Sequence, residues 1–398
     1  MIANAITVEA ALEALLDLVS PMPSETIPLR QAAGRVLAQD VTAKRAQPPF
    51  AASAMDGYAV MGDVAPGQQF TLIGEAAAGH GFTGTLQAGE TVRIFTGAPL
   101  PEGATRVIIQ EDVTRSEDVI TLNNTLDAAT YIRPAGGDFN IGDAISAPRV
   151  LRPADLALLA SMNCAEVPVT RKPVVALIAT GDELVMPGEA PNADQIIASN
   201  TFGLMAMFQA AGAHVLMLPI AKDTESSLGL ALELAQDADL IVTIGGASVG
   251  DHDIVGKVAA DQGLERSFYK VAMRPGKPLM AGRLGDAVLV GLPGNPVSSM
   301  VCGDIFIYPM LQKMRGLRGH ARARSQAPLA KALPQNGPRE HYMRAYFNEQ
   351  TGTVEAFARQ DSSLLTVLSA ANALIVRPVN DPAREAGEPV EYIALHPA

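Results

Sequence analysis

The feature that most constrains the fold is a set of apolar, β-branched runs in the middle of the chain. Val174–Ile178, Leu240–Val242 and Val288–Val290 show no alternation with polar residues. Such runs are typical of strands that are buried on both faces of a parallel sheet. Helix-like segments that begin near Ser199 and Thr224 lie between them. Repeated strand–helix units of this kind predict a doubly wound sheet with helices on both faces.

Three glycine-rich turns lie close together in this region, and they begin at Gly245, Arg274 and Gly291. A turn between a strand and a helix start directs backbone N–H groups toward a bound anion. One such turn is weak support, because it is also a common structural loop. Three turns with nearby cations indicate a phosphorylated ligand. The residues that we expect to bind it are Gly245, Gly246, Ser248, Arg274, Lys277, Pro278, Gly294, Asn295, Pro296 and Ser298.

Acidic residues also gather at the predicted strand ends. Asp251 and Asp253 follow the first glycine turn, and Glu183 and Asp223 follow two other strands. An Asp at a helix start is more often a cap than a metal ligand. The convergence of several acids beside a phosphate site nevertheless favours Mg²⁺, which uses one or two carboxylates and several waters. We therefore predict a metal site at Asp251 and Asp253. His252, between the two acids, is interpreted as a residue without a ligand role.

The composition limits the partners of the protein and its compartment. The chain has 398 residues and a formal net charge of -12, which indicates several domains and argues against nucleic acid or an anionic membrane as the main partner. No apolar run approaches the ~20 residues that span a bilayer, and the N-terminus lacks a signal-peptide pattern. Cys164 and Cys302 are far apart in the sequence. We expect no membrane association and a cytoplasmic location.

The expected pattern of helices and strands divides the chain into three regions. Residues 1–169 contain helices and many short strands, and we expect two discontinuous subdomains there. Residues 170–320 alternate strand and helix, and residues 321–398 are mostly β. The predicted fold class is α/β multidomain, with a central αβα doubly wound domain, a β-rich N-terminal region with helices and a small C-terminal β-barrel-like domain. Arg344–Phe347 and Val354–Phe357 are expected to form a hairpin in the last region.

Two stiff loops in the first region have no clear function from local pattern alone. Ser53–Ala59 contains an Asp-Gly step after a Pro-Pro turn, and Phe95–Gly103 is a strand followed by a loop with two prolines. Both are more often structural turns than functional sites. No Walker A pattern or Ser-His-Asp order is present in the sequence.

In their order and combination, the motifs resemble the molybdopterin molybdenumtransferases of the MoeA family, which are similar to the E domains of gephyrin and its plant counterpart. The resemblance spans nearly the whole chain. It implies a transferase of molybdenum cofactor biosynthesis that inserts molybdate into the dithiolene of adenylylated molybdopterin and releases AMP with Mg²⁺ present. The motifs that carry it are Pro48–Phe50, Ser53–Ala59, Phe95–Pro101, Thr180–Leu184, Gly245–Gly250, Arg274–Pro278 and Gly291–Pro296.

The resemblance also assigns roles that the local pattern leaves open. It implies that Arg344 and Ser362 contact molybdate, and that the protein is a homodimer in which the N-terminal loops of one subunit complete the site of the other. A partner implied by the reaction is the adenylyltransferase that supplies the substrate. The catalytic residues that the resemblance implies are Asp56, Thr96, Glu183, Asp223 and Asp253.

Two alternative functions remain open at this point. A molybdopterin adenylyltransferase shares only the αβα domain, so the additional N-terminal and C-terminal regions argue against that activity. A gephyrin-like scaffold would predict degraded acidic positions, whereas the acids of this chain are intact.

Overall fold

The computed structural model describes residues 5–246 and 254–395. The chain forms two compact units. Unit 1 comprises Met1–Glu25, Gly34–Ala38 and Val169–Ala398, and unit 2 comprises Thr26–Ala33 and Gln39–Pro168. Within the described ranges, no helix is both long enough and apolar enough to cross a membrane. The three-region division of the sequence at residues 169 and 320 stays a prediction.

Unit 1 is built around a six-stranded sheet that contains the apolar runs of the sequence. Strands β18, β15, β19 and β23 pair in parallel, while β22 and β20 add an antiparallel edge. The predicted fold class is confirmed, but the sheet is mixed because a tight turn at Gly285 joins β22 to β23 as a hairpin. Its order is β18 (His214–Met217), β15 (Val174–Ala179), β19 (Leu240–Ile244), β23 (Ala287–Leu292), β22 (Pro278–Leu284) and β20 (Glu265–Lys270).

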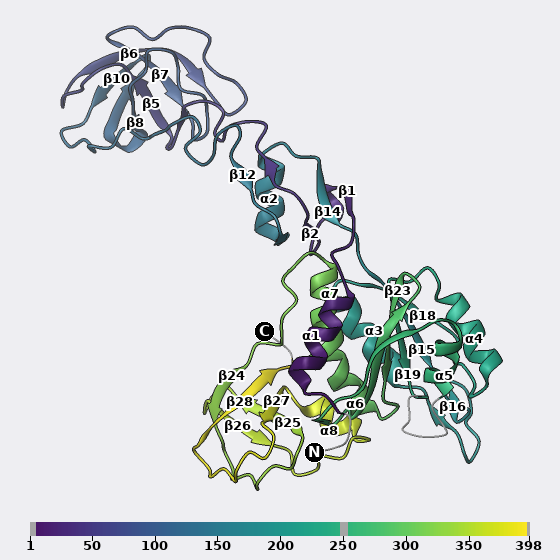
Figure 1. The fold of residues 1–398 in the computed structure, drawn as a ribbon. Coiled ribbons are helices and arrows are strands. Elements are labelled where there is room, and N and C mark those ends of the chain that lie inside the picture. The colour runs from purple at the N-terminus through teal and green to yellow at the C-terminus, as the bar shows by residue number, and fades with distance from the viewer. Residues whose placement is uncertain (1–4, 247–253, 396–398) are drawn as a thin grey trace. The chain divides into compact units, whose positions relative to one another are not determined.

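Helices cover both faces of this sheet. One face packs against α4 and α5, and the other packs against α1, α3 and the segment α6–α7, which includes one π-helical stretch (Figure 1). The predicted helix after Ser199 is present, although the Ser199 side chain makes no capping hydrogen bond. The helices are α1 (Val8–Leu18), α3 (Asn200–Ala210), α4 (Glu225–Leu234), α5 (Ile254–Asp261), α6 (Pro296–Cys302), the π-helix Gly303–Ile307 and α7 (Tyr308–Met314).

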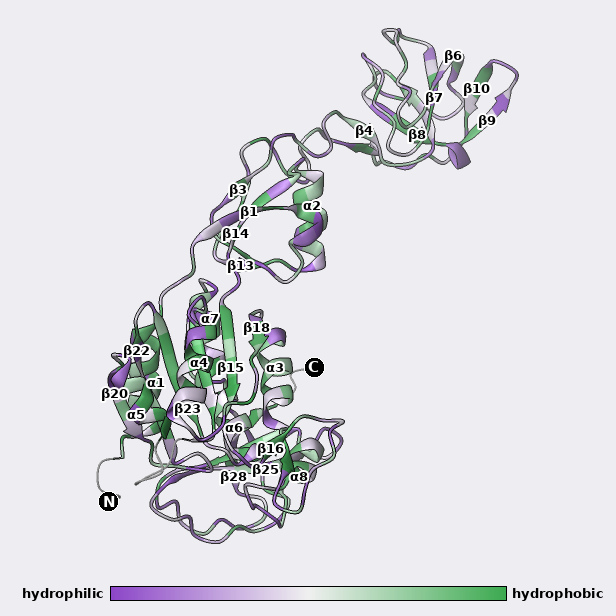
Figure 2. Ribbon diagram, turned by 90° about the vertical axis from the view of Figure 1, so that its right-hand side faces the viewer, coloured by the Kyte–Doolittle hydropathy of each residue, from purple (hydrophilic) through white to green (hydrophobic). Residues whose placement is uncertain are grey.

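The apolar side chains of the strands are divided between two cores. Val175 and Leu177 of β15 enter the core beneath α1 and α3, while Ala176 and Ile178 enter the core beneath α4 and α5. Figure 2 shows the central strand β15 of this sheet in the hydrophobic colour. Because both faces of β15, β19 and β23 are buried, polar side chains of these strands can be exposed only at the strand ends.

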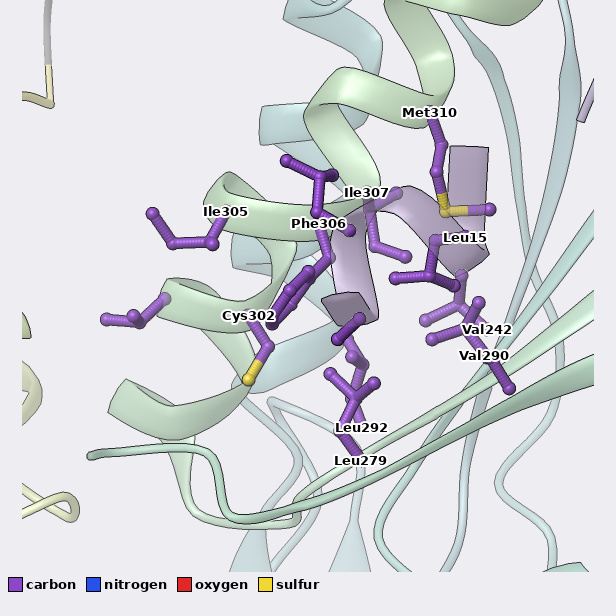
Figure 3. Close-up of a cluster of buried hydrophobic side chains, with 14 of the residues drawn as sticks. Leu15, Val242, Leu279, Val290, Leu292, Cys302, Ile305, Phe306, Ile307 and Met310 are labelled. Carbon is purple, nitrogen blue, oxygen red and sulfur yellow. The ribbon is translucent and has the colours of Figure 1, made fainter. Parts of the chain in front are cut away.

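Helix α1 begins after a capping residue and packs its apolar face into the first core. Thr7 is the N-cap residue and accepts a hydrogen bond from Ala10 N at 3.1 Å through Oγ1. Leu15 then packs in the same cluster as Phe306 and Met310, together with Val242 and Val290 of the sheet (Figure 3).

A second sheet in unit 1 is formed by the C-terminal region. Strand β21 pairs in parallel with β25 and places Arg274 opposite His341. The predicted hairpin is confirmed, since β25 pairs with β26 in antiparallel register. The order is β21 (Met273–Arg274), β25 (Glu340–Asn348), β27 (Ala373–Arg377), β28 (Pro389–Ala394) and β24 (Ser325–Pro328), with β26 (Thr353–Ala356) beside β25 and helix α8 (Leu365–Ala370) in the connection before β27.

Unit 2 contains a six-stranded sheet of its own. Its order is β8 (Arg106–Ile109), β5 (Gly57–Val60), β7 (Glu90–Ile94), β6 (Gln69–Ala76), β10 (Val119–Leu122) and β9 (Val113–Ser116). The other helical segments are the 3₁₀ turns Leu29–Gln31 and Gln110–Asp112, and α2 (Pro153–Ser161). The remaining short strands outside the two large sheets of unit 1 are β1 (Ser24–Pro28), β2 (Val36–Leu37), β3 (Val41–Thr42), β4 (Ala52–Ser53), β11 (Ile132–Arg133), β12 (Ala144–Ile145), β13 (Arg149–Val150), β14 (Glu166–Thr170), β16 (Leu184–Val185) and β17 (Ile196–Ile197).

The first core predicts a strong dependence on Phe306, whose side chain is 0% exposed. We expect Phe306→Ala to lower the free energy of unfolding by about 3–5 kcal/mol, because apolar contacts are lost and a cavity remains. Urea denaturation followed by circular dichroism measures the effect. The control is Leu230→Ala, where the native side chain is 58% exposed and the expected change is within about 0.5 kcal/mol. Equal losses in the two variants would contradict this account of the core.

Candidate functional site

A cavity of about 590 Å³ opens in unit 1 at the carboxyl ends of β15 and β19. Its wall is formed by segments that follow β15, β19 and β23, by residues 196–201, and by Ser363 of the C-terminal region. The carboxyl edge is where ligands bind in sheets of this type. The predicted site residues that line the cavity are Glu183, Asp223, Gly245, Gly246, Pro278, Gly294, Asn295 and Pro296.

The first glycine turn brings the backbone unusually close to the end of β15. Gly245 and Gly246 have φ values of +89° and +63°, which other residues rarely adopt. A Cβ atom on Gly246 would lie 2.7 Å from the Thr180 hydroxyl oxygen, so only glycine fits this turn. The Thr180 hydroxyl has no hydrogen-bond partner among the described residues, and its side chain is buried. Thr180 begins the motif Thr180–Leu184, but the sequence did not predict it as a site residue.

Two carboxylates stand side by side at this edge because the chain segments that carry them pair with each other. Gly181 N donates to Ala221 O at 3.1 Å, and Asp223 N donates to Asp182 Oδ1 at 3.3 Å. Burial, and then the charges of Asp182 and Glu183, raise the pKa of Asp223. The predicted pair Glu183 and Asp223 therefore lines one cavity, and Asp223 holds a proton more readily than an ordinary aspartate.

The Glu183 carboxylate packs over a glycine backbone. A Cβ atom on Gly181 would lie 2.3 Å from Glu183 Oε2. The φ of Gly181 is +149°, which favours glycine as well. The backbone conformation therefore favours glycine here, and a larger residue would also displace the Glu183 carboxylate from its present place.

A pair of short apolar strands, β16 and β17, borders the cavity next to Glu183 and Asp223. Strands β16 and β17 pair in parallel, and Ile196 N donates to Glu183 O at 2.7 Å. Ile196 and Ile197 line the cavity while 59% and 38% exposed. Sequence reasoning missed both residues, although an Ile-Ile pair within a polar loop is a recognisable signal.

The structure also brings Arg344 and Ser362 toward the start of α6. Arg344 N donates to Gln360 Oε1 at 3.0 Å, and Arg344 Nη2 donates to Asp361 O at 3.1 Å. The Ser362 carbonyl in turn accepts a hydrogen bond from Val297 N at 3.0 Å. These contacts connect β25 to the segment that follows the third glycine turn.

Arg344 is a buried cation whose charge is poorly balanced. Its side chain is 0% exposed, and Nε and Nη1 have no hydrogen-bond partner within the described ranges. Burial, and then the charge of Arg274, lower the pKa of Arg344 to about 10. A buried charge without a counterion is costly. The free edge of this guanidinium is chemically suited to a small oxyanion.

His341 lies within the influence of these arginines and was missed by the sequence reasoning. Its side chain is buried, and Nε2 has no partner among the residues that the structure describes. Burial, and then the charges of Arg274 and Arg344, lower the pKa of His341 to about 3. The imidazole is therefore neutral at physiological pH, and the local positive charge comes from the arginines.

Other predicted site residues differ in how far they are exposed. Arg274 is exposed and Lys277 is half-buried, as a binding role requires. The sequence predicts that Ser298 contacts the ligand. In the structure its side chain is buried within α6, so its hydroxyl does not lie on an open face. Ser248, Asp251 and Asp253 lie outside the described residues. Within 5–246 and 254–395, no group of three or more His, Cys, Asp and Glu side chains could hold a metal ion.

In unit 2, the structure brings together Asp56 and Thr96, which were assigned only through the family resemblance. The backbone N–H and the hydroxyl of Thr96 donate to Asp56 Oδ1 at 2.7 and 2.8 Å. These contacts lower the pKa of Asp56. The Thr96 N–H has the largest effect, the Thr96 hydroxyl follows, and the charge of Arg93 has a smaller effect. Pairing of β5 with β7 places the two loops side by side.

This pair predicts a specific effect of Thr96→Val on the ionisation of Asp56. Loss of the hydroxyl donor should raise the pKa of Asp56 toward the ordinary value. Because the native pKa is lowered, the stabilisation is present above the unfolded-state pKa and is lost as the pH falls through the folded-state value. A carbon-detected NMR titration of the Asp56 carboxyl measures the shift. Thr96→Ser keeps both donors and should titrate like the native protein; a rise in Thr96→Ser as large as in Thr96→Val would contradict the assignment.

Known protein families match nearly the whole length of the chain. Residues 6–163 match the family described as "MoeA N-terminal region (domain I and II)". Residues 176–313 match "Probable molybdopterin binding domain", and residues 326–395 match "MoeA C-terminal region (domain IV)". The matched ranges contain both the Asp56–Thr96 pair and the cavity of unit 1.

Relatives and solved structures agree with these matches. "Molybdopterin molybdenumtransferase 2" of Mycobacterium tuberculosis is 36% identical and covers 88% of this chain and 90% of its own. The "Molybdopterin molybdenumtransferase" of Haemophilus influenzae is 34% identical, with 93% and 94% coverage. A crystal structure of the molybdopterin biosynthesis MoeA protein from Pyrococcus horikoshii superposes with a TM-score of 0.82 at 27% identity, over 98% of this chain and 100% of that one. The chain therefore belongs to the MoeA family of molybdopterin molybdenumtransferases.

Proposed function

We propose that this protein inserts molybdate into molybdopterin as a step of molybdenum cofactor biosynthesis, taking adenylylated molybdopterin and releasing AMP. The curated relatives named above carry the name of this transferase and match about nine-tenths of the chain. The single observation that carries the proposal is the Arg344 guanidinium, which is fully buried with two unpaired nitrogen atoms among the described residues.

Molybdate is a tetrahedral dianion, and the chemistry around Arg344 suits it. The planar fork of an arginine can donate two parallel hydrogen bonds to an oxyanion. Ser362 is held close by the contacts of the 360–362 segment, and Arg274 supplies further positive charge. In this proposal the substrate provides the sulfur ligands. Burial raises the pKa of the Cys302 thiol, so this cysteine is not available as a thiolate.

The phosphate-bearing part of the substrate is assigned to the glycine turns. Gly245, Gly246, Gly294 and Asn295 line the cavity, where backbone N–H groups of such turns can contact a phosphate. We propose Asp251 and Asp253 as Mg²⁺ ligands, with Asp253 also needed for catalysis. The metal ion, when bound, would neutralise charge on the pyrophosphate link as it is cleaved.

We also propose a homodimer in which one subunit completes the active site of the other. Asp56 and Thr96 belong to unit 2, whereas the residues that line the described cavity all belong to unit 1. The Asp56 carboxylate, fixed by two donors, would then be supplied to the cavity by a neighbouring chain. A cytoplasmic location and transient contact with the adenylyltransferase that supplies the substrate complete the proposal. Neither alternative, adenylyltransferase or scaffold, is favoured by a specific observation.

Anaerobic incubation with adenylylated molybdopterin, Mg²⁺ and increasing molybdate tests the reaction, with released AMP as the readout. We expect molybdate-dependent AMP release by the native protein. Arg344→Met should raise the molybdate concentration for half-maximal release at least about tenfold, because a charge-assisted, two-pronged contact is lost. The matched control is Lys331→Met, which removes an exposed cation of the same C-terminal region.

The two negative outcomes have different meanings. If the native protein releases no AMP, the proposed reaction is wrong. If Arg344→Met responds to molybdate like Lys331→Met, the reaction stands but Arg344 is not the oxyanion residue. Circular dichroism confirms that both variants are folded before the assay.

The shared active site predicts complementation between two inactive variants. Asp56→Asn and Asp253→Asn homodimers should each release AMP slowly. The two variants are co-expressed with different tags, and mixed dimers are purified through both tags. These mixed dimers should recover about half of the native activity, because one of the two symmetric sites contains both native acids. No recovery in the purified mixed dimer would contradict the proposal that the two acids come from different subunits.

A further inference from the structure

We infer that Arg93 is a positioning residue for the reaction, because its guanidinium contacts both of the loops that carry Asp56 and Thr96 and holds them in one geometry. The inference rests on the proposed function, in which Asp56 acts in catalysis. It adds the residue that keeps the Asp56 carboxylate in place, and every contact that supports it lies within unit 2.

The Arg93 guanidinium lies over two aromatic rings. Its Cζ atom is 4.9 Å from the ring centroid of Tyr58 and 4.9 Å from that of Phe95. A cation and an aromatic face attract each other within about 6 Å. Tyr58 follows Asp56 by two residues. Phe95 directly precedes Thr96, so the cation packs against both of the loops.

Both terminal nitrogen atoms of Arg93 donate to residues that adjoin Asp56. Nη1 donates to Gly57 O at 3.1 Å, and Nη2 donates to Gln110 Oε1 at 2.6 Å. Gln110 in turn donates from its backbone N to Asp56 O at 3.1 Å. The planar fork of an arginine can hold two acceptors in fixed directions, which the single ammonium group of a lysine cannot do. Arg93 therefore holds the backbone next to Asp56 at two points.

The pair itself lies outside the paired strands. Asp56 precedes β5, and Thr96 comes two residues after the end of β7, so the hydrogen bonds between these strands do not include either residue. Thr96 is also exposed. The geometry of the pair therefore depends on side-chain contacts, and Arg93 supplies such contacts to both loops.

The charge of Arg93 acts in the same direction as its contacts. After the two Thr96 donors, this charge contributes to the lowered pKa of Asp56. The other charged side chains on the strands and the 3₁₀ turn around the pair do not contribute to it. They are Glu75, Glu90, Arg106, Glu111 and Asp112. Arg93 is therefore the cation in the described part of the chain that acts on this carboxylate.

An NMR titration of the full-length protein with isotope-labelled threonine tests the inference without the reaction. The Thr96 N–H donates to the Asp56 carboxylate, so its resonance follows the ionisation of that carboxyl, and its loss in Thr96→Ser identifies it. We expect Arg93→Met to raise the pKa of Asp56 toward the ordinary value, because a charge is lost and the Thr96 donors are no longer held in place.

Matched variants separate the geometry from the charge. Arg93→Lys keeps the charge but not the fork, so it should also raise the pKa of Asp56. Phe95→Leu removes one of the two rings and should act in the same direction with a smaller effect. The control is Arg115→Met, which removes an exposed cation of β9 that donates to Glu117 O. This variant should titrate like the native protein.

The AMP-release assay tests whether the position of Asp56 matters for the reaction. Arg93→Met should lower kcat at least about tenfold, because a small displacement of a catalytic group slows the chemical step strongly. The KM for adenylylated molybdopterin should stay close to the native value. In an Asp56→Asn background, the same substitution should change kcat little further, because the residue that Arg93 positions is already lost.

The inference is overturned if Asp56 titrates in Arg93→Met as in the native protein, or if Arg93→Lys restores the native titration in full. It is also overturned if Arg93→Met lowers kcat by the same factor with and without Asp56. The other threonine resonances show whether each variant is folded. If Arg93→Met is unfolded, the titrations of Arg93→Lys and Phe95→Leu take its place, and native behaviour of both overturns the inference.

These outcomes are distinguishable from failure of the proposed function. If the native protein releases no AMP, the proposed reaction is wrong, and the titration still tests whether Arg93 positions Asp56. Molybdate-dependent AMP release by the native protein, together with a native titration in Arg93→Met, would overturn only the role of Arg93.

Discussion

Burial of the unit 1 sheet on both faces is the constraint on which the rest of the site depends. Val175 and Leu177 are committed to one core, and Ala176 and Ile178 are committed to the other. No face of the central strands β15, β19 and β23 is left for polar chemistry, so functional side chains of these strands are confined to the strand ends. The glycine turns make this edge usable, because Gly245 and Gly246 bring the backbone close to Thr180 without a side chain between them.

Charge is divided between distinct places in unit 1. Glu183 and Asp223 place two acids in the wall of the cavity, while Arg344 is buried with two unpaired guanidinium nitrogens in the described part of the chain. Neither arrangement is favourable for the protein alone, since like charges repel and the buried cation is only partly balanced by Asp361. A bound oxyanion would supply the missing negative charge at Arg344.

Much of the fold could be predicted from the sequence, because the signals are local. The apolar runs predicted β15, β19 and β23, and helices were predicted to begin near Ser199 and Thr224, where α3 and α4 begin. The antiparallel edge could not be predicted, since the turn at Gly285 looks like any other loop. Asp56 and Thr96 were found only through the family resemblance, because their contact depends on the pairing of strands distant in sequence. Burial made Thr180 and His341 notable, whereas exposure made the Ile196–Ile197 pair notable, and both are tertiary properties.

If the Arg344 guanidinium holds the oxyanion, anomalous diffraction at the molybdenum absorption edge should locate molybdate beside it. Crystals of the native protein and of Arg344→Met would be soaked in the same molybdate solution. We expect an anomalous peak within hydrogen-bond distance of Arg344 Nε and Nη1, and no peak at this position in the variant. A peak elsewhere in the native protein, or a peak that persists at the same position in the variant crystals, would contradict it.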